Sequence, residues 1–349
     1  MVENNEVDYF IICFFIFSTS SSKAETVQEG LSLLNEGKYE DANEVFKSLS
    51  DKGNAKASYW LAYTQFKTSG TLGAGSSLLK AAEGGNPWAM ATLAGTHMPK
   101  VTTSYCNYLG WPCDEKWVDK AIEGWEKLAE EGDGKAMYAL LYHDPSWWQY
   151  IPIYSDYRYG KIARKLYENK GFAFFYDSSF WSFFNEEKRV EYLGKMASDG
   201  DGVASYKLFH ILEENEEIRK AISTIENGIK ERNSYALYSA SVGLIRLKRT
   251  YSIGSKDEKT SKRAYFYCSA ADSLLGNNDR CRAINFFDFE YDRNIGMHKY
   301  YDKVTGERVT EKQLENIRKE AKEYVAGYHT DLKLDETTVE FFKGYSDNL

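Results

Sequence analysis

The chain has 349 residues, with 44 Lys and Arg against 52 Asp and Glu, and a formal net charge of −8. Nucleic-acid-binding proteins present basic faces and anionic membranes attract basic segments, so this acidic balance disfavours both as partners. The composition, 43% hydrophobic and 28% charged, is that of a folded globular chain, and its length exceeds that of a typical single domain. The 5 prolines are few enough to suit long helical runs.

The first 24 residues have features of a signal peptide. Tyr9–Phe17 is apolar or aromatic throughout, too short for the roughly 20 residues that span a bilayer but suited to the core of a signal peptide. Ser22–Ala24 follows as a small-x-small cleavage site. Three acidic residues precede the apolar run, where a signal peptide has basic ones. We predict cleavage after Ala24 and export to the periplasm; the alternative is a cytoplasmic protein in which the apolar run is a buried strand.

Four cysteines remain after that cleavage, and an even number suits an oxidising compartment. Cys106 and Cys113 flank turn-rich sequence and form one candidate disulfide. Cys268 and Cys281 form the other. If both lay on antiparallel helices that turn near Gly276, their positions along the helix axes would differ by about 7 Å. That offset would strain a disulfide, because it stretches the allowed distance between the two Cα atoms. Two free buried thiols are therefore the alternative for the second pair.

Five short strings recur along the chain and predict the turns of helical hairpins. They are Gly53–Ala57, Gly85–Ala89, Gly132–Ala136, Gly200–Ala204 and, in degenerate form, Asn233–Ala236. The residues 11, 7, 4 and 3 positions before each of the four glycines are mostly apolar or small, which is the spacing of one helix face. Glycine readily adopts the left-handed backbone conformation that ends a helix, and the Asn or Asp after it can cap the next helix. Each hairpin needs a neighbour to cover its apolar face.

These strings resemble Sel-one-like (Sel1-like) repeats, the branch of the tetratricopeptide superfamily with a Gly-Asp/Asn-x-x-Ala turn. Clear units cover roughly residues 27–212, and weaker ones continue to about residue 283. The resemblance implies an all-α fold, a right-handed α/α solenoid of helix-turn-helix repeats, which we predict over residues 25–295. Residues 296–349 are predicted to hold a tight turn at Tyr301–Glu307, a C-terminal capping helix and a tail. The capping box Thr310–Gln313 would open that helix, which would end near Ala326.

Two insertions interrupt the repeats and hold the candidate partner-binding residues. The first lies near residues 99–117 and contains Tyr105 and Trp111. The second lies near residues 144–159 and contains Trp147, Trp148, Tyr150, Tyr154, Tyr157, Arg158 and Tyr159. Tyr, Trp and Arg dominate binding hot spots, and insertions in solenoids collect on a binding face. The alternative is that these rings fill widened gaps between repeats.

A third aromatic run, Phe172–Phe184, has no basic flank. We therefore predict a buried solenoid helix there and no stable membrane insertion.

Motifs of catalysis and cofactor binding do not occur in the sequence. The five histidines are scattered, none has the spacing of HExxH, and no GxSxG elbow, phosphate-binding loop or GxGxxG fingerprint is found. We therefore predict a protein that is not an enzyme and that needs neither cofactor nor metal.

The resemblance also implies a function. Exported Sel-one-like proteins include immunity proteins that neutralise secreted antibacterial effectors, often lipases delivered by the type VI secretion system. This chain is therefore expected to be a periplasmic immunity protein whose partner is another protein, a cognate toxic effector that it inhibits. The alternative is a cell-envelope scaffold or adaptor that organises a multiprotein complex, and a peptidoglycan-acting enzyme is a third class.

Overall fold

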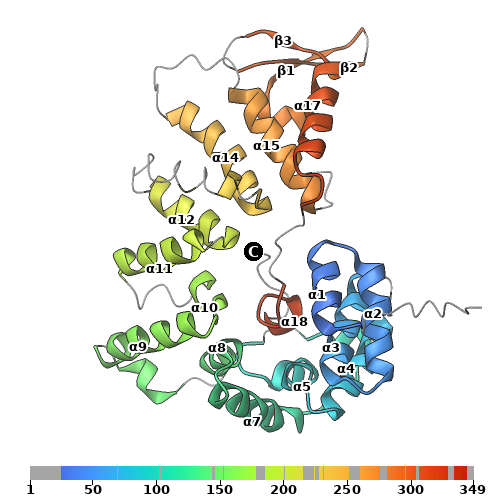
Figure 1. Cartoon of the computed structure of the whole chain (residues 1–349), viewed down its shortest axis with the longest axis vertical. Helices are drawn as coiled ribbons and strands as arrows, with labels where there is room; N and C mark the ends of the chain where they lie inside the picture. Colours follow the sequence, from blue (N-terminus) through green and yellow to red (C-terminus); the bar gives the residue numbers. More distant parts are fainter. Residues whose placement is uncertain are drawn as a thin grey trace, which may run out of the picture.

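Figure 1 presents a computed structural model of the chain, in which the helices follow one another around an open arc. The structure describes residues 25–343 except 69, 102–103, 144–145, 152, 178–184, 200, 215–223, 225–227, 231, 251–259, 276–280, 295, 304–305 and 329–333. The predicted signal peptide and the glycine of the fourth repeat string, Gly200, lie outside the described residues.

The bounds of the elements are as follows. The first half holds α1 (Val27–Asn35), α2 (Tyr39–Asp51), α3 (Ala55–Lys67), α4 (Thr71–Glu83), α5 (Pro87–Ala94), η1 (Gly95–His97), α6 (Cys106–Leu109), α7 (Trp117–Glu130) and α8 (Gly134–His143). The second half holds η2 (Trp147–Tyr150), α9 (Tyr154–Glu168), α10 (Ala173–Tyr176), α11 (Glu186–Ser198), α12 (Gly202–Glu214), α14 (Ser234–Thr250), α15 (Thr260–Leu275), α16 (Ala283–Phe286), β1 (Asp288–Asp292), β2 (Met297–Tyr301), β3 (Arg308–Val309), α17 (Glu311–Tyr324) and α18 (Glu340–Lys343).

The hairpin turns have the geometry that the repeat strings predict. Gly53, Gly85 and Gly132 have φ angles of +87°, +90° and +92°, the left-handed conformation that ends a helix. The Asn or Asp that follows accepts a hydrogen bond from the backbone N–H three residues on, at 2.9 Å for both Asn54 and Asn86. The same cap occurs at 3.0 Å, 2.9 Å and 3.2 Å in the other strings, made by Asp133, Asp201 and Asn233.

The predicted helix faces form one continuous core. The alanine of each turn string is 0% or 1% exposed, and so are Phe46, Leu78, Trp125 and Leu193, which lie seven residues before the four glycines. Successive helices pack against one another from α1 to α5, from α5 through α7 to α8, and from α11 through α12 and α14 to α15. The predicted all-α solenoid of helical hairpins is therefore confirmed.

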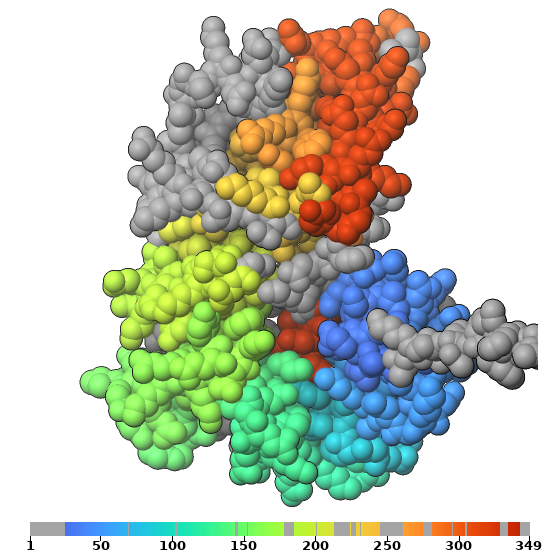
Figure 2. All heavy atoms as spheres, in the orientation of Figure 1, coloured from blue at the N-terminus to red at the C-terminus, as the bar shows by residue number. Residues whose placement is uncertain are grey.

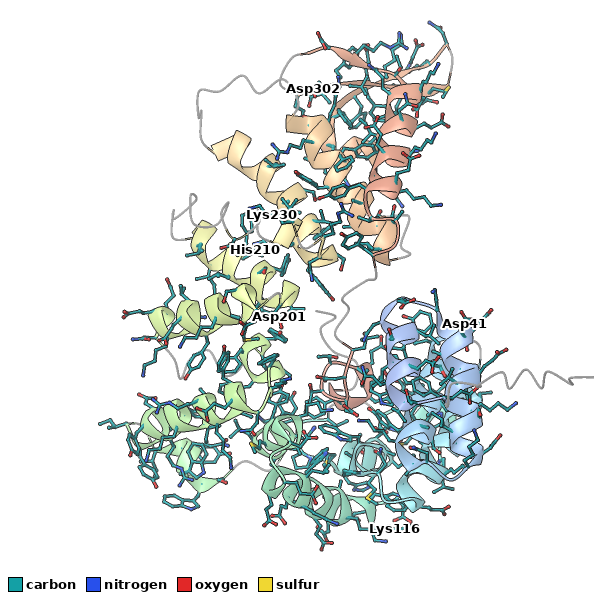
Figure 3. The ribbon with its side chains drawn as sticks, viewed as in Figure 1. Asp41, Lys116, Asp201, His210, Lys230 and Asp302 are labelled. Atoms are coloured by element: carbon teal, nitrogen blue, oxygen red, sulfur yellow. A yellow bond between two sulfur atoms is a disulfide. The ribbon has the colours of Figure 1, made fainter. Side chains whose placement is uncertain are left out.

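Buried Tyr–Asp pairs join neighbouring units of the solenoid. The Tyr138 hydroxyl on α8 donates to Asp177 at 2.7 Å, and burial, followed by the charge of Asp177, raises the pKa of Tyr138 well above its usual value. The Tyr176 hydroxyl on α10 donates to Asp201. Asp201, which Figure 3 labels, also caps α12. Asp201 therefore stabilises the α10–α12 contact as well as its own helix.

The aromatic run Phe172–Phe184 differs from its prediction as one buried helix. Its described part forms only the four-residue α10, which is buried and ends at Tyr176, with Asp177 as its extended C-cap. The remaining residues, 178–184, lie outside the described part of the chain.

A three-stranded antiparallel sheet, which the sequence analysis did not predict, follows α16. Its strand order is β1-β2-β3, with Asp288 opposite Tyr301 and Tyr300 opposite Val309. The turn expected at Tyr301–Glu307 connects β2 to β3, and the Gly306 N–H donates to Asp302 O at 2.8 Å with φ +71° at Gly306. Strand β1 lies inside the range predicted to be solenoid.

The C-terminal part of the chain divides into two pieces that lie far apart along the arc. Helix α17 begins with the capping box of Thr310 and Gln313 and packs against α15. Residues 334–343, which we call the C-terminal segment, lie instead inside the arc beside α1, α5 and α8 (Figure 1). In Figure 2 their dark red atoms fill the space between the blue N-terminal helices and the green middle ones. The C-terminal segment is thus a packed element of the fold.

Candidate protein-binding surfaces

The second insertion divides into an exposed surface and a buried anchor. Trp147, Tyr150, Tyr154 and Tyr157 are 69%, 76%, 40% and 60% exposed, and Arg158 is exposed as well. With Ile153, which is 85% exposed, these six side chains form what we call the aromatic ledge. Trp147 and Tyr150 come from η2, Ile153 immediately precedes α9, and the other three lie at the start of α9. Exposed large apolar side chains gathered in one short stretch of chain make a candidate protein-binding site, because such groups otherwise avoid water.

Contacts between its rings and cations hold the aromatic ledge together. The ring centroids of Trp147 and Tyr154 are 6.2 Å apart, with 19° between the ring planes. The Arg158 guanidinium lies 5.8 Å from the Tyr154 centroid, and its Nη1 donates to the Tyr154 hydroxyl at 3.3 Å. Lys161 Nζ lies 4.6 Å from the Tyr157 centroid. These contacts restrict the rings before any partner binds, which lowers the entropy lost on binding.

Trp148 and Tyr159 anchor the ledge from below. They are 6% and 1% exposed, their ring centroids are 5.1 Å apart, and the Arg158 guanidinium lies 4.9 Å from the Trp148 centroid. Burial, with a smaller contribution from Tyr150, raises the pKa of Tyr159 to about 12. These two candidates therefore pack in the core, as the gap-filling alternative proposed.

The backbone at the centre of the ledge is strained. Ile153 has φ +58°, a left-handed conformation that is rare for a β-branched residue because its side chain crowds the backbone. Two helical hydrogen bonds hold it in place, from Ser155 N to Ile151 O at 2.9 Å and from Tyr157 N to Ile153 O at 3.1 Å. Strain of this kind is concentrated at functional sites, where surrounding structure maintains it.

The first insertion is buried. Tyr105 and Trp111 are 8% and 5% exposed, and the Trp111 indole donates to Thr71 O at 3.0 Å. A Cβ on Gly75 would lie 2.6 Å from the Trp111 ring, so glycine allows the insertion to pack directly on α4. Tyr105 and Trp111 thus pack between parts of the solenoid, as the alternative that these rings fill gaps between repeats expects. Cys106 and Cys113 form a disulfide with 5.8 Å between their Cα atoms.

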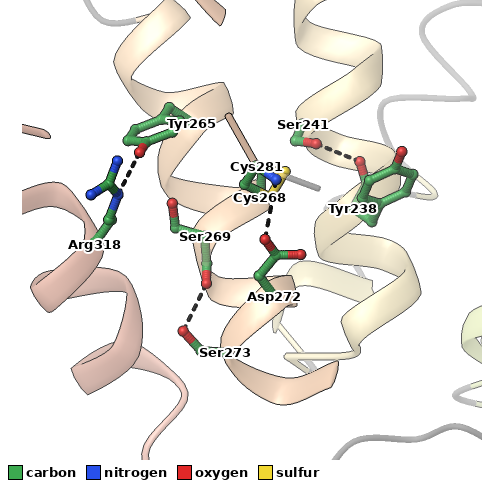
Figure 4. Close-up of a disulfide and its surroundings, with 9 residues drawn as sticks. All are labelled: Tyr238, Ser241, Tyr265, Cys268, Ser269, Asp272, Ser273, Cys281 and Arg318. Carbon is green, nitrogen blue, oxygen red and sulfur yellow. Dashed lines mark hydrogen bonds between the residues drawn. A yellow bond between two sulfur atoms is a disulfide. The ribbon is translucent and has the colours of Figure 1, made fainter. Parts of the chain in front are cut away.

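Cys268 and Cys281 also form a disulfide, with a Cα–Cα distance of 5.7 Å (Figure 4). Cys268 lies on α15, but Cys281 lies on a non-helical stretch before α16, so the height difference expected for two antiparallel helices does not arise. The Cys281 N–H donates to Asp272 of α15 at 3.1 Å. The pair is therefore bonded and the free-thiol alternative does not hold. Two disulfides are typical of a protein in an oxidising compartment.

The inner face of the arc holds a second site, which the sequence analysis missed. Three lysines of the solenoid contact two carboxylates of the C-terminal segment. Lys135 Nζ lies 2.5 Å and Lys56 Nζ 3.5 Å from the Glu336 carboxylate, and Lys67 Nζ lies 2.5 Å from Glu340. Burial by itself raises the pKa of Glu336, but Lys135 and Lys56 outweigh burial and hold that pKa below its usual 4.5.

Two consecutive phenylalanines of the segment enter adjacent aromatic pockets, and both are 5% exposed. Phe341 has ring centroids within 5.2–6.3 Å on all sides, and its neighbours are Tyr59, Tyr63, Phe66, Tyr105 and Trp111. Phe342 has ring centroids within 4.9–5.8 Å, and its neighbours are Trp88, Tyr138, Tyr142 and His143. The candidates Tyr105 and Trp111 therefore line a pocket that the chain itself fills.

In the part of the chain that the structure describes, no group of three or more His, Cys, Asp and Glu side chains is arranged to hold a metal ion. None of the helices described combines the length and apolarity needed to cross a bilayer.

Among known proteins, the chain is similar to solved structures in its fold. No family model matches the chain, and neither does any curated protein. The chain resembles the crystal structure of a Sel1 repeat protein from Oxalobacter formigenes, with 19% identity and a TM-score of 0.39 over 70% of this chain and 100% of that one. It also resembles a protective antigen of uropathogenic Escherichia coli strains that displays an SLR fold, with 16% identity and a TM-score of 0.32 over 86% of this chain and 69% of that one. Both are Sel1-like repeat proteins, and the solenoid assignment itself rests on the hairpin caps of this chain.

Proposed function

We propose that this chain is an exported, non-enzymatic protein-binding solenoid that works as a periplasmic immunity protein. It binds a secreted antibacterial effector, a lipase of the type VI class, and inhibits it. The aromatic ledge carries the proposal: Trp147, Tyr150 and Tyr157 are more than half exposed, and the strained backbone at Ile153 presents them. The two disulfides support an oxidising compartment.

In this mechanism the ledge is the anchor of the complex. Exposed Trp and Tyr side chains that lose their water on binding contribute most of the affinity of a protein interface. Rings that cover the mouth of the effector's active site would exclude its substrate without any reaction on the solenoid. Cleavage after Ala24 removes three acidic residues and Lys23, so the net charge changes from −8 to −6 (−8 + 3 − 1). That negative charge would steer the encounter toward a basic surface of the effector.

The test is a binding experiment with a matched control variant. Residues 25–349 are produced in a bacterial periplasm together with the product of the adjacent gene, and the dissociation constant of the complex is measured. The ledge variant replaces Trp147, Tyr150 and Tyr157 by Ala; the control replaces Phe289 and Tyr291 of β1, which are 48% and 54% exposed. We expect a one-to-one complex that the ledge variant weakens at least about 100-fold and the control leaves unchanged.

Other results would contradict parts of the proposal. A complex that is equally tight with both variants would place the interface away from the ledge. The absence of a complex at micromolar concentration would refute the dedicated inhibitor. Several weaker partners recovered with the wild-type chain would then favour the envelope scaffold or adaptor.

A further inference from the structure

The C-terminal segment contacts a part of the solenoid far from the helix that precedes it. Helix α17 packs on α15, whereas residues 334–343 contact residues between Asn35 of α1 and His143 of α8. The Leu334 N–H donates to Asn35 Oδ1 at 2.9 Å, which places one end of the segment beside α1. The segment therefore contacts a part of the solenoid other than the one that holds α17.

The backbone of the segment satisfies much of its own hydrogen bonding. Asp335 accepts from the Thr337 N–H at 2.7 Å, and its own N–H donates to Thr338 Oγ1 at 2.9 Å. The Phe342 N–H donates to Val339 O at 3.1 Å. Because these bonds lie within the segment, its side chains make the main contacts with the solenoid. Side-chain contacts depend on sequence, so the inner face discriminates between segments.

The contact has the anatomy of a protein–peptide interface. Two buried aromatic side chains, Phe341 and Phe342, form its centre, and lysine–carboxylate pairs at Glu336 and Glu340 lie around them. The Glu336 side chain is 4% exposed, and its two lysines come from different helices, α3 and α8. A hydrophobic core needs no such pairs, since apolar side chains of similar volume replace them at little cost in stability.

We propose that the inner face formed by α1, α3, α5 and α8 is a peptide-binding site, distinct from the aromatic ledge, which the chain's own C-terminal segment occupies. Its ligand in a partner protein is a segment with a carboxylate followed, five and six residues later, by two adjacent aromatic side chains. That spacing is the one between Glu336 and the Phe341–Phe342 pair. A partner segment of this kind competes with the C-terminal segment and displaces it.

Self-occupation sets how strongly the partner segment must bind. Because the segment and its site belong to one chain, the effective concentration of the segment at the site is on the order of 1 mM, so a site with an intrinsic dissociation constant of about 10 µM is about 99% occupied in cis. The apparent affinity for a free peptide is then about 100-fold weaker than the intrinsic one. The inner face is therefore closed to weak ligands and open to strong ones.

The test makes the full chain cleavable between α17 and the C-terminal segment. A protease site is inserted between Tyr328 and Leu334, the folded protein is cut, and a labelled synthetic peptide of residues 334–349 is added. Fluorescence anisotropy reports exchange of the peptide, and circular dichroism reports the fold. We expect the cut chain to take up the peptide with a dissociation constant about 100-fold lower than that of the uncut chain.

A charge exchange distinguishes specific recognition from general stickiness. A peptide with Glu336→Lys is expected to bind the cut wild-type chain about 100-fold more weakly, because it breaks a buried ion pair. A cut chain with Lys135→Glu and Lys56→Glu is expected to prefer the Glu336→Lys peptide over the native one. A peptide with Phe341→Ala and Phe342→Ala binds neither chain.

Three results would overturn the proposal. In the first, the cut chain stays folded but never exchanges its segment, which makes the segment a fixed part of the core. In the second, the cut chain loses its helicity when the segment leaves, which likewise makes the segment a fixed part of the core. In the third, uncut chains form dimers that trade C-terminal segments, which replaces occupation in cis by a second copy. None of these measurements uses an effector, so the immunity proposal stands or fails separately.

Discussion

Replacement of Trp148 by Ala tests the division of the second insertion into ledge and anchor, because its neighbour Trp147 is a matched control. The two residues are identical in type and adjacent in sequence, but Trp148 is 6% exposed and Trp147 is 69% exposed. Trp148 also makes an edge-to-face contact with Tyr159 at 5.1 Å and lies under the Arg158 guanidinium at 4.9 Å. The structure therefore predicts opposite effects for the same substitution.

The size of the effect follows from burial. Truncation of a buried Trp to Ala costs about 3–5 kcal/mol, which includes the cavity left behind. We expect about 3 kcal/mol for Trp148→Ala, at the lower end because the insertion can relax around the cavity. Trp147→Ala removes a ring that is mostly in water already, so its effect on the free energy of unfolding is expected within about 0.5 kcal/mol.

Urea unfolding followed by circular dichroism measures the free energy of unfolding of both variants. A binding assay with the protein that the ledge recognises then shows which of the two residues contributes to binding. Trp147→Ala is expected to weaken binding and leave stability unchanged. Trp148→Ala is expected to lower stability first, and binding only through the displaced ledge. Equal losses of stability in the two variants would refute the burial argument and with it the assignment of Trp148 to the anchor.

Three further predictions concern features that hold the arc together. Asp201→Ala removes the cap of α12 and the acceptor of the Tyr176 hydroxyl, so urea unfolding should show a loss of about 2–3 kcal/mol, against about 1 kcal/mol for a cap alone; a loss no larger than the cap value would contradict the double role. Cys268→Ser opens a loop of sequence separation 13, and the chain-entropy model gives a loss of about 3 kcal/mol; a melting temperature that matches that of the wild type would count against it. Lysine pairing lowers the pKa of Glu336 in the folded chain, so its contribution to stability is full above the usual value of 4.5 and is lost as the pH falls through the folded-state pKa. Glu336→Gln should therefore be less stable than wild type by about 1–3 kcal/mol at pH 7, and the gap should narrow below pH 4.5 in a urea titration series; a gap independent of pH would show that the ion pair with Lys135 does not set it.

The two surfaces differ in how far the sequence could identify them. The second insertion is visible as a cluster of Trp, Tyr and Arg that breaks the repeat spacing. Adjacent residues such as Trp147 and Trp148 carry the same sequence signal, however, and only packing against Tyr159 decides which one is buried. The C-terminal segment carries a weaker signal, which is two phenylalanines that follow several acidic residues. Nothing in the neighbouring sequence indicates that these phenylalanines contact residues that lie about 200 or more positions earlier in the chain.

The sequence by itself determined the hairpins, because helix faces and caps depend on residues three, four and seven positions apart. Asn54 and Asn86 could be assigned as caps from the strings around them, and both make that contact. Only the tertiary structure decided the pairing of β1 with β2, the Cys268–Cys281 bond and the occupation of the inner face by Phe341 and Phe342. The β1–β2 pairing and the disulfide are local in sequence, but the occupation of the inner face joins segments about 200 or more residues apart. Their approach depends on how the whole arc curves, and that curvature is the sum of many small packing choices between neighbouring hairpins.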